Sequence, residues 1–431
     1  MQYYSLNKIS PEVNFKEATI QGQAPDKGLY FPAELPALPK SFFNDIKTYS
    51  KEAIALKVIA PYVSDTIPQN ILEEIVAKTI AFDFPLVKVD DRISSLELFH
   101  GPTLAFKDVG AGFMSRCLGY FAKGQEKEIT VLVATSGDTG GAVAAGFAGV
   151  EGVNVVILYP SGKVSKVQEQ QLTTWGGNIR ALEVKGNFDD CQQMVKQAFT
   201  DKDLSEKLFL TSANSINVAR WLPQQFYYFF AMQQWNNEEP PVISVPSGNF
   251  GNICAGMLAH ASGLPVKHFI AACNANDAVT EYLSNGNYKT KKAVATISNA
   301  MDVGNPSNFV RILELLQNEF EALKKVMSSY SITDDETRTT IRKLYSENHY
   351  LPDPHGAVGY LALQRYLESR PADSGFFLET AHPVKFYDVV EPILGEAVPV
   401  PAPVQAIMKK EKKSVLIEAE YEELKSFLLK H

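Results

Sequence analysis

The chain has few cysteines, four among 431 residues. Cys117, Cys191, Cys254 and Cys273 are far apart in the sequence, and no two of them form a C-x-x-C pair. Because a zinc site or a redox dithiol needs closely spaced cysteines, neither is indicated, and we predict no metal site. We expect four free thiols that are buried as small apolar side chains, in a reducing compartment.

A long apolar run and an excess of basic residues are also missing. No stretch reaches the ~18–20 apolar residues of a membrane span, and the start, MQYYSLNKISPEVNF, has no pattern of a secretory signal. Lys and Arg number 41 against 49 Asp and Glu, which gives a formal charge of -8. We therefore predict a cytoplasmic protein that binds neither membranes nor nucleic acids. An anionic ligand would need locally arranged positive groups.

The length indicates more than one lobe, because one hydrophobic core stops growing at roughly 250–300 residues. Hydrophobic residues make up 45% of the chain and charged residues 21%, which excludes wholesale disorder. The first ~90 residues mix short helical patterns with proline-rich connectors, and we interpret them as an accessory N-terminal lobe. Near the other end, AVPVPAPV at 397–404 predicts an extended linker, and KKEKK at 409–413 a solvated charge cluster.

From residue 129 onward, apolar runs of strand length alternate with helical patterns. This alternation predicts an α/β fold with two open, mostly parallel sheets and flanking helices, in addition to the N-terminal lobe. In such folds, ligands bind in the crevice at the carboxyl ends of the strands. The predicted strands are ITVLVA (129–134), VNVVIL (153–158) and IRALEV (179–184) in one sheet, and VISV (242–245), HFIAAC (268–273) and GFFL (375–378) in the other.

The second sheet begins with a strand that enters a glycine-rich turn and then a helix, SVPSGNFGNICAGMLAH at 244–260. Such a turn places unpaired backbone N–H groups and a helix dipole at one point, which suits a phosphate. It matches neither the P-loop pattern nor the dinucleotide fingerprint. Taken alone, it would be interpreted as a plain tight connection. The turn consists of Gly248, Asn249, Phe250, Gly251 and Asn252.

A second strand-to-helix loop, VLVATSGDTGGAVAAGF at 131–147, is rich in hydroxyl groups. Thr135, Ser136 and Thr139 could offer donors to a carboxylate at the helix N-terminus. Asp138 could cap the helix. A merely capped helix start fits this loop equally well.

Lys107 lies in an apolar segment, between Phe106 and Val109. Partial desolvation there would lower the proton affinity of its amine and make it nucleophilic. The alternative is a surface lysine whose stem lies along apolar neighbours. A candidate covalent lysine together with two anion-binding loops is what pyridoxal phosphate and an amino-acid substrate require, and this combination favours the functional interpretation.

A fourth segment, LTSANSINVARWLPQQ at 210–225, combines amide and hydroxyl groups with an arginine. Asn214, Ser215 and Arg220 would suit a second anion such as a phosphate monoester. The alternative is a capped helix start with the arginine in a surface ion pair.

These segments resemble the threonine synthase family, within the fold-type II, tryptophan-synthase-like pyridoxal phosphate enzymes. HGPTLAFKD together with SGNFGN is the most specific part of the resemblance, and GLYFP and SNAMDVGNPSN are typical of the longer, microbial and fungal branch. The matching pieces follow the family order from about Gly28 to Phe386: GLYFP, LELFHGPTLAFKD, ATSGDTGGAVA, VVILYPSGKVSKVQEQQ, GGNI, SANSIN, VPSGNFGN, SNAMDVGNPSN and TAHPVKF.

The resemblance implies roles for the candidate residues. Lys107 would bind pyridoxal phosphate covalently and then move protons, the turn at 248–252 would hold the cofactor phosphate, and Thr380 would meet the pyridine nitrogen. The substrate O-phospho-L-homoserine would be bound through its carboxylate by Thr135, Ser136 and Thr139, and through its phosphate by Asn214, Ser215 and Arg220, with Lys163 as a weaker candidate.

The reaction implied is that of a pyridoxal-phosphate-dependent carbon–oxygen lyase, which converts O-phospho-L-homoserine and water to L-threonine and phosphate, the last step of threonine biosynthesis. The implied parts are an N-terminal lobe (1–92), a catalytic region (93–390) whose subdomain at about 110–210 closes over the substrate, and a C-terminal extension (391–431). We expect a monomer or a homodimer. Two alternatives are a related phospholyase or serine/threonine dehydratase that lacks the water addition, and a non-catalytic phosphometabolite-binding module without a cofactor.

Overall fold

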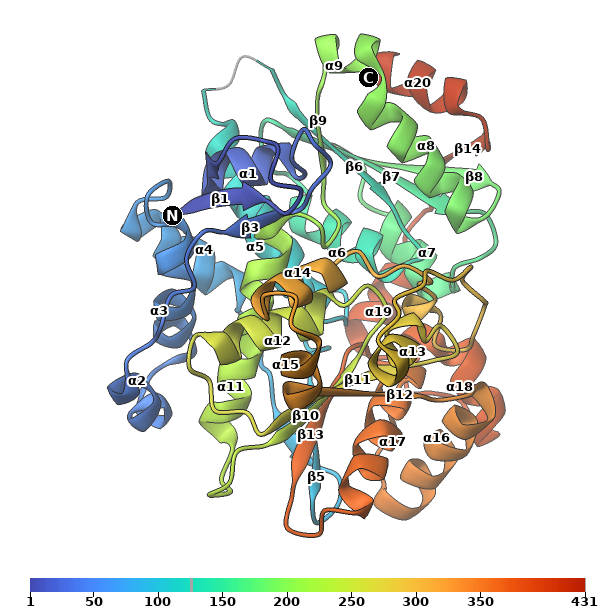
Figure 1. Ribbon diagram of the computed structural model, residues 1–431. Helices are drawn as coiled ribbons and strands as arrows, with labels where there is room; N and C mark the ends of the chain where they lie inside the picture. The colour runs from blue at the N-terminus through green and yellow to red at the C-terminus, as the bar shows by residue number, and fades with distance from the viewer. Residues whose placement is uncertain (125–126, 431) are drawn as a thin grey trace.

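The computed structural model describes residues 1–124 and 127–430 and contains three sheets. The N-terminal sheet is small and antiparallel, in the order β2-β1-β3. Four helices accompany it, and Figure 1 shows this N-terminal part beside the two larger sheets. Its elements are β1 (Gln2–Ser5), β2 (Val13–Asn14), α1 (Phe15–Gln21), β3 (Tyr30–Pro32), α2 (Lys40–Asn44), α3 (Lys51–Val63) and α4 (Gln69–Thr79).

The large sheet has six strands in the order β12-β11-β10-β13-β5-β4. Its neighbouring strands run parallel except for β4, which is antiparallel to β5. The strands are β4 (Leu86–Lys88), β5 (Ile93–Glu97), β10 (Val242–Pro246), β11 (His268–Cys273), β12 (Met327–Ser331) and β13 (Gly375–Glu379).

The small sheet has five strands, all parallel, in the order β14-β8-β7-β6-β9. Both larger sheets are therefore open and mostly parallel, and this prediction is confirmed. The strands are β6 (Ile129–Ala134), β7 (Val153–Pro160), β8 (Ile179–Lys185), β9 (Phe209–Ser212) and β14 (Ser414–Glu418).

Helices cover both faces of the large sheet, because its central strands are apolar on both sides. Val242 and Ile243 are adjacent in β10 and point to opposite faces. Val242 packs in the cluster that contains Val358 of α17, whereas Ile243 packs in the cluster that contains Ile253 of α12. Burial on both faces is typical of parallel sheets. In Figure 1, α16 and α17 lie on one side of this sheet and α11 and α12 on the other.

The helices from α5 onward connect the strands and cover the two larger sheets. Those before β10 are α5 (Lys107–Ala122), α6 (Asp138–Phe147), α7 (Lys166–Thr173), α8 (Phe188–Thr200), α9 (Lys202–Lys207), α10 (Val218–Trp221) and α11 (Phe226–Gln234). Those after it are α12 (Gly251–Ala261), α13 (Ala278–Asn285), α14 (Phe309–Leu315), α15 (Phe320–Val326), α16 (Asp334–Asn348), α17 (Pro354–Glu368), α18 (Tyr387–Leu394), α19 (Ala402–Met408) and α20 (Tyr421–Lys430).

The prediction of an extended linker at 397–404 is wrong for its second half. Helix α19 begins at Ala402, with Pro401 as its N-cap residue. Val398 and Val404 are buried in the cluster that contains Phe386. The burial of Val398 and Val404 thus outweighs the preference of the neighbouring prolines for an extended backbone. A proline is also compatible with the first turn of a helix.

All five residues of the charge cluster at 409–413 are exposed, as predicted, and two of them also contact other elements. Lys412 lies 2.7 Å from Glu169 Oε1 and 2.6 Å from Glu183 Oε2, and the Lys413 N–H donates to the Thr173 carbonyl. These contacts attach the segment before β14 to α7 and β8. The C-terminal end of the chain therefore extends the small sheet by one strand.

Candidate functional site

The predicted site residues lie beyond the carboxyl ends of strands from both larger sheets. Thr135 directly follows β6 and Thr380 directly follows β13, while the turn at 248–252 comes after β10. Lys107 begins α5, which follows β5, and Arg220 lies in α10, which follows β9. This is the edge at which open α/β sheets bind ligands.

The position of Lys107 is set by the strand beside it. The Phe106 N–H donates to the Thr380 carbonyl over 2.9 Å, and Ala105 pairs with Ala381 in an isolated β-bridge. These contacts join the residues before α5 to the end of β13. The backbone at Lys107, the first residue of α5, is therefore held in place. Its side chain is 18% exposed.

The surroundings of Lys107 favour the neutral amine. Its Nζ lies 3.7 Å from Asp138 Oδ2 and 4.6 Å from the centre of the Phe106 ring. Burial is the largest influence and lowers the pKa of Lys107; Asp138 opposes this change, while Lys385 and Arg220 add to it. Because the net shift is downward, more of the amine is unprotonated and nucleophilic at neutral pH than in an ordinary lysine.

The turn at 248–252 is tightly enclosed. Phe250 has a left-handed backbone, with φ of 60°, and α12 begins at the next residue. A Cβ added to Gly248 would lie 2.7 Å from the Met301 Cα, so the turn is packed directly against another backbone segment. The first N–H groups of α12 have no partners within the helix. They provide donors and a positive dipole end for an anion.

Asn252 adds a further donor at the start of α12. Its Oδ1 accepts hydrogen bonds from the hydroxyl groups of Tyr227 and Tyr228, over 2.7 and 2.8 Å. These bonds fix the orientation of the amide, and its buried Nδ2 has no hydrogen-bond partner among the described residues. An unpartnered buried donor costs free energy unless a ligand accepts from it. The turn therefore fits the phosphate of pyridoxal phosphate.

The loop after β6 is held by one of its own hydroxyl groups. Thr135 Oγ1 accepts from the N–H groups of Gly137, over 3.0 Å, and Gly140, over 2.9 Å. Ser136 and Thr139 are half-buried. The prediction that Asp138 caps α6 is wrong, because Gly137 is the N-cap residue.

Asp138 instead forms a buried ion pair. Its Oδ1 lies 2.9 Å from Lys385 Nζ and also accepts a hydrogen bond from Gln168 Nε2 over 3.0 Å. Burial alone would raise the pKa of Asp138, but Lys385, Lys107 and the hydrogen bonds outweigh it and hold this pKa well below its ordinary value. Asp138 is therefore ionised across the neutral range.

Arg220 is a buried cation whose guanidinium is only partly paired. It is 3% exposed, and its Nε and Nη1 have no hydrogen-bond partners among the described residues. A Cβ on Gly110 would lie 3.2 Å from Arg220 Nε, so the guanidinium lies against the first turn of α5. Burial lowers the pKa of Arg220 to about 10, which leaves it charged at neutral pH. A buried, unpaired charge of this kind favours an anionic ligand.

The other residues predicted for the substrate phosphate are Ser215, Asn214 and Lys163, and their surroundings differ from those of Arg220. Ser215 Oγ accepts hydrogen bonds from the side-chain amides of Asn249, over 2.8 Å, and Asn308, over 3.0 Å. Ser215 therefore lies against the turn at 248–252. Asn214 is half-buried beside it, and Lys163 is exposed.

Three family descriptions match the chain. The pyridoxal-phosphate dependent enzyme family matches residues 93–375, the threonine synthase N terminus matches residues 2–80, and the threonine synthase C-terminal region matches residues 356–428. Threonine synthase of Escherichia coli K12 is 44% identical over 403 residues, which cover 93% of each chain. The chain belongs to the threonine synthase family.

Solved structures of threonine synthases agree with this family over nearly the whole chain. The crystal structure from Escherichia coli has a TM-score of 0.93, with 43% identity and coverage of 100% of both chains. The pyridoxal-phosphate-bound structure from Brucella melitensis also has a TM-score of 0.93, with 34% identity, and covers 99% of this chain and 98% of its own. The predicted family, fold-type II architecture and pyridoxal-phosphate-dependent lyase activity are confirmed, and a non-catalytic binding module is not supported.

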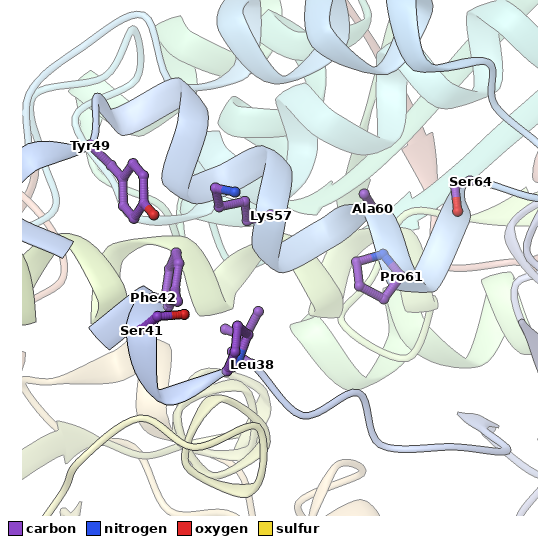
Figure 2. A pocket seen from close by; sticks show the side chains of 9 residues that line it. Leu38, Ser41, Phe42, Tyr49, Lys57, Ala60, Pro61 and Ser64 are labelled. Carbon is purple, nitrogen blue, oxygen red and sulfur yellow. The ribbon is translucent and has the colours of Figure 1, made fainter. Parts of the chain in front are cut away.

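Two findings concern the rest of this threonine synthase family member. Figure 2 shows a pocket of about 460 Å³ between α2 and α3, where Leu38, Phe42, Tyr49 and Lys57 line it, and none of the predicted site residues does. Throughout residues 1–124 and 127–430, no helix combines the length and apolar character needed to cross a membrane.

Two residues near Lys107 were not predicted from the sequence, Lys385 and Gln168. Lys385 lies in the TAHPVKF segment and Gln168 in the VSKVQEQQ segment, both of which the family resemblance includes. Their spacing along the chain carries no signal of contact, since each meets Asp138 only in the folded molecule. All four cysteines are free and buried, as expected.

Proposed function

We propose that the chain binds O-phospho-L-homoserine between Arg220 and the loop at 135–139, and converts it with water to L-threonine and phosphate. The observation that carries this proposal is the buried, partly unpaired guanidinium of Arg220 beside the helix of Lys107. In a chain with a formal charge of -8, a substrate with anionic groups at both ends needs such local donors.

The cofactor would be held at three points. Lys107 would bind the aldehyde carbon covalently, the backbone of residues 248–252 would bind the phosphate, and Thr380 would meet the pyridine nitrogen. When bound, pyridoxal phosphate serves as an electron sink for the charge left after a proton is removed from Cα of an amino acid. A hydroxyl group at position 380 does not enforce a charged pyridine ring as a carboxylate would.

The substrate would be held at its two charged ends. Thr135 accepts two backbone N–H groups, so its own hydroxyl proton is free to be donated to the substrate carboxylate, together with donors from Ser136 and Thr139. Asn214, Ser215 and Arg220 would bind the substrate phosphate. Contacts at both ends would fix Cα near the Lys107 amine, which would then accept and return protons at Nζ.

The larger parts of the molecule would support this chemistry. We divide the chain into an N-terminal lobe (1–92), a catalytic region (93–390) and a C-terminal extension (391–431). Closure of the subdomain at about 110–210 would exclude water from the reacting atoms. The buried free thiols favour a reducing, cytoplasmic setting, where the protein would act as a monomer or a homodimer.

The decisive test compares Arg220→Ala with the wild-type protein in the conversion of O-phospho-L-homoserine. Loss of a charged hydrogen-bond donor costs roughly 1.5–3 kcal/mol, so we expect the KM to rise by about 10- to 150-fold. The exposed Arg342→Ala is the control and should leave the KM unchanged. An unchanged KM in Arg220→Ala would disprove the assigned phosphate site.

The covalent site is tested separately. Borohydride reduction of the cofactor-loaded protein, followed by peptide mass spectrometry, should place the pyridoxyl label on Lys107. A label on another lysine would overturn the proposal as a whole.

A further inference from the structure

Lys385 is a buried lysine to which the function proposed above assigns no role. It lies in a short 3-10 helix (Pro383–Phe386) after β13, and its side chain is 0% exposed. Its Nζ donates to the Thr103 carbonyl over 2.8 Å and lies 2.9 Å from Asp138 Oδ1. A fully buried lysine is rare without a carboxylate partner, and here the partner is the same carboxylate that faces Lys107.

Asp138 is therefore shared between two lysines. Oδ1 faces Lys385 at 2.9 Å, and Oδ2 faces Lys107 at 3.7 Å. One carboxylate cannot fully balance two buried ammonium ions, so the closer contact of Asp138 with Lys385 leaves less stabilisation for an ammonium group at Lys107. Lys385 has the shorter contact and a carbonyl acceptor as well. Asp138 is therefore engaged mainly by Lys385, and this favours the neutral amine at Lys107.

Other charged groups also face Lys107, but none replaces Asp138. Arg220 approaches from α10 and disfavours its ammonium form, whereas Asp353, before α17, favours it. Asp353 is turned toward the Gly356 N–H, to which its Oδ1 is bonded over 2.7 Å. Asp108, on the same helix as Lys107, accepts from the N–H and hydroxyl groups of Thr103 and also attracts the Lys385 ammonium group. Asp138 is the carboxylate in closest contact with the Lys107 amine.

We propose that Lys385 is a positioning residue for Lys107: by pairing with Asp138, it prevents that carboxylate from holding a proton on the Lys107 amine. The inference rests on the proposed function, because it explains how the amine that would bind the cofactor is kept reactive. It also links two parts of the fold, since Asp138 begins α6 beside the small sheet, whereas Lys385 follows β13 of the large sheet.

The test measures the protonation of Lys107 in the full-length, cofactor-free protein. Formaldehyde and cyanoborohydride methylate neutral amines, and peptide mass spectrometry gives the extent at Lys107 as a function of pH. In Lys385→Met, Asp138 would pair with Lys107 alone, and the labelling midpoint should rise by roughly 1–3 pH units. In Asp138→Asn, the attraction between residue 138 and the Lys107 ammonium group is lost while Lys385 remains, so the labelling midpoint should fall.

The double variant and a control complete the experiment. Asp138→Asn/Lys385→Met removes both charges, and its midpoint should lie between those of the single variants. Lys166→Met removes an ammonium group in α7 that is 51% exposed, and should leave the midpoint unchanged. If Lys385→Met does not fold, the comparison of Asp138→Asn with the double variant still applies, and the double variant must have the higher midpoint.

A purely structural Lys385 gives a different result. Midpoints that all coincide with the wild-type value, or that all move in one direction, would overturn the proposal. A failure of the proposed function would be detected by a separate experiment: borohydride reduction of the cofactor-loaded wild-type protein would then leave Lys107 unlabelled.

Discussion

Glu379, at the end of β13, is a single buried carboxyl group next to the candidate cofactor site. Its Oε1 accepts from the Asp353 N–H over 2.6 Å, and its Oε2 has no hydrogen-bond partner within the described part of the chain. Burial, reinforced by repulsion from Asp353, raises the pKa of Glu379 well above its ordinary value. Folding therefore favours the protonated form of this carboxyl group.

This raised pKa makes stability depend on pH with a defined sign. The contribution of Glu379 is complete below the ordinary glutamate pKa of about 4.3, and is lost as pH rises toward the higher folded-state pKa, by up to ~1.4 kcal/mol per pH unit. We expect Glu379→Gln to reduce the fall in Tm that occurs as pH rises above about 4.3. Thermal unfolding of the full chain measures this.

The exposed Glu12→Gln serves as the control for charge removal, and should show the same pH dependence as the wild-type protein. If Glu379→Gln lost stability with pH as steeply as the wild-type protein, Glu379 would have to be ionised in the fold.

At the scale of elements, the connection from β10 to α12 illustrates how one helix start becomes a binding site. A Cβ on Gly248 would lie 2.7 Å from the Met301 Cα and 3.0 Å from the Ala300 carbonyl oxygen. Both are backbone atoms, so the turn would have to shift as a whole. The candidate phosphate site therefore depends on a residue without a side chain.

We expect Gly248→Ala to weaken the binding of pyridoxal phosphate. A backbone shift forced by overpacking costs roughly 1–3 kcal/mol, which corresponds to an increase in Kd of about 5- to 150-fold. Fluorescence titration of the cofactor-free chain measures the Kd. Gly112→Ala is the matched control, because a Cβ there would lie 3.0 Å from the tip of the flexible Arg116 side chain and at an ordinary contact distance, 4.0 Å, from the Thr79 Cα. Equal affinities in the two variants would show that the turn does not hold the cofactor.

At the scale of the whole molecule, Arg311 forms hydrogen bonds with parts of the chain that are far apart in the sequence. It is fully buried and donates to the carbonyls of Tyr30, Ser215 and Ile216. Its guanidinium also stacks 4.4 Å from the centre of the Trp221 ring. This side chain, which belongs to α14, thus contacts both the N-terminal sheet and the segment that precedes α10.

Replacing this arginine should destabilise the molecule and loosen its N-terminal part. Arg311→Leu leaves the buried Tyr30 carbonyl and the part-buried Ser215 and Ile216 carbonyls without this donor. An unpaired buried carbonyl costs roughly 1–3 kcal/mol, so we expect a loss of about 2–3 kcal/mol in urea unfolding and faster proteolysis after residue 32. Arg311→Lys should recover only part of the loss, because an ammonium group lacks the planar fork. The half-exposed Arg338→Leu should change stability by less than ~0.5 kcal/mol. A stable Arg311→Leu would contradict this role.

Local sequence patterns were sufficient to predict the central strands and the loops that follow them. The run 129–134 is apolar throughout and forms β6, and the run 268–273 forms β11 as predicted. Strands β12 and β14 were not predicted, because β12 (MSSYS) is largely polar and the apolar centre of β14 (SVLIE) is only three residues long. The helix at Ala402 was missed because it is stabilised by packing against Phe386, which is not visible in the local sequence.

The amino-acid sequence by itself determined the family, the two parallel sheets and the position of Lys107 in an apolar segment, because these depend on residue types and on short-range periodicity. Only the tertiary structure decided how the charges are shared. Lys385 and Thr103 are 282 residues apart and yet in contact, and their meeting places one carboxylate, Asp138, between two buried lysines. Burial and distance, which arise only on folding, then determine how strongly this carboxylate acts on each of the two amines.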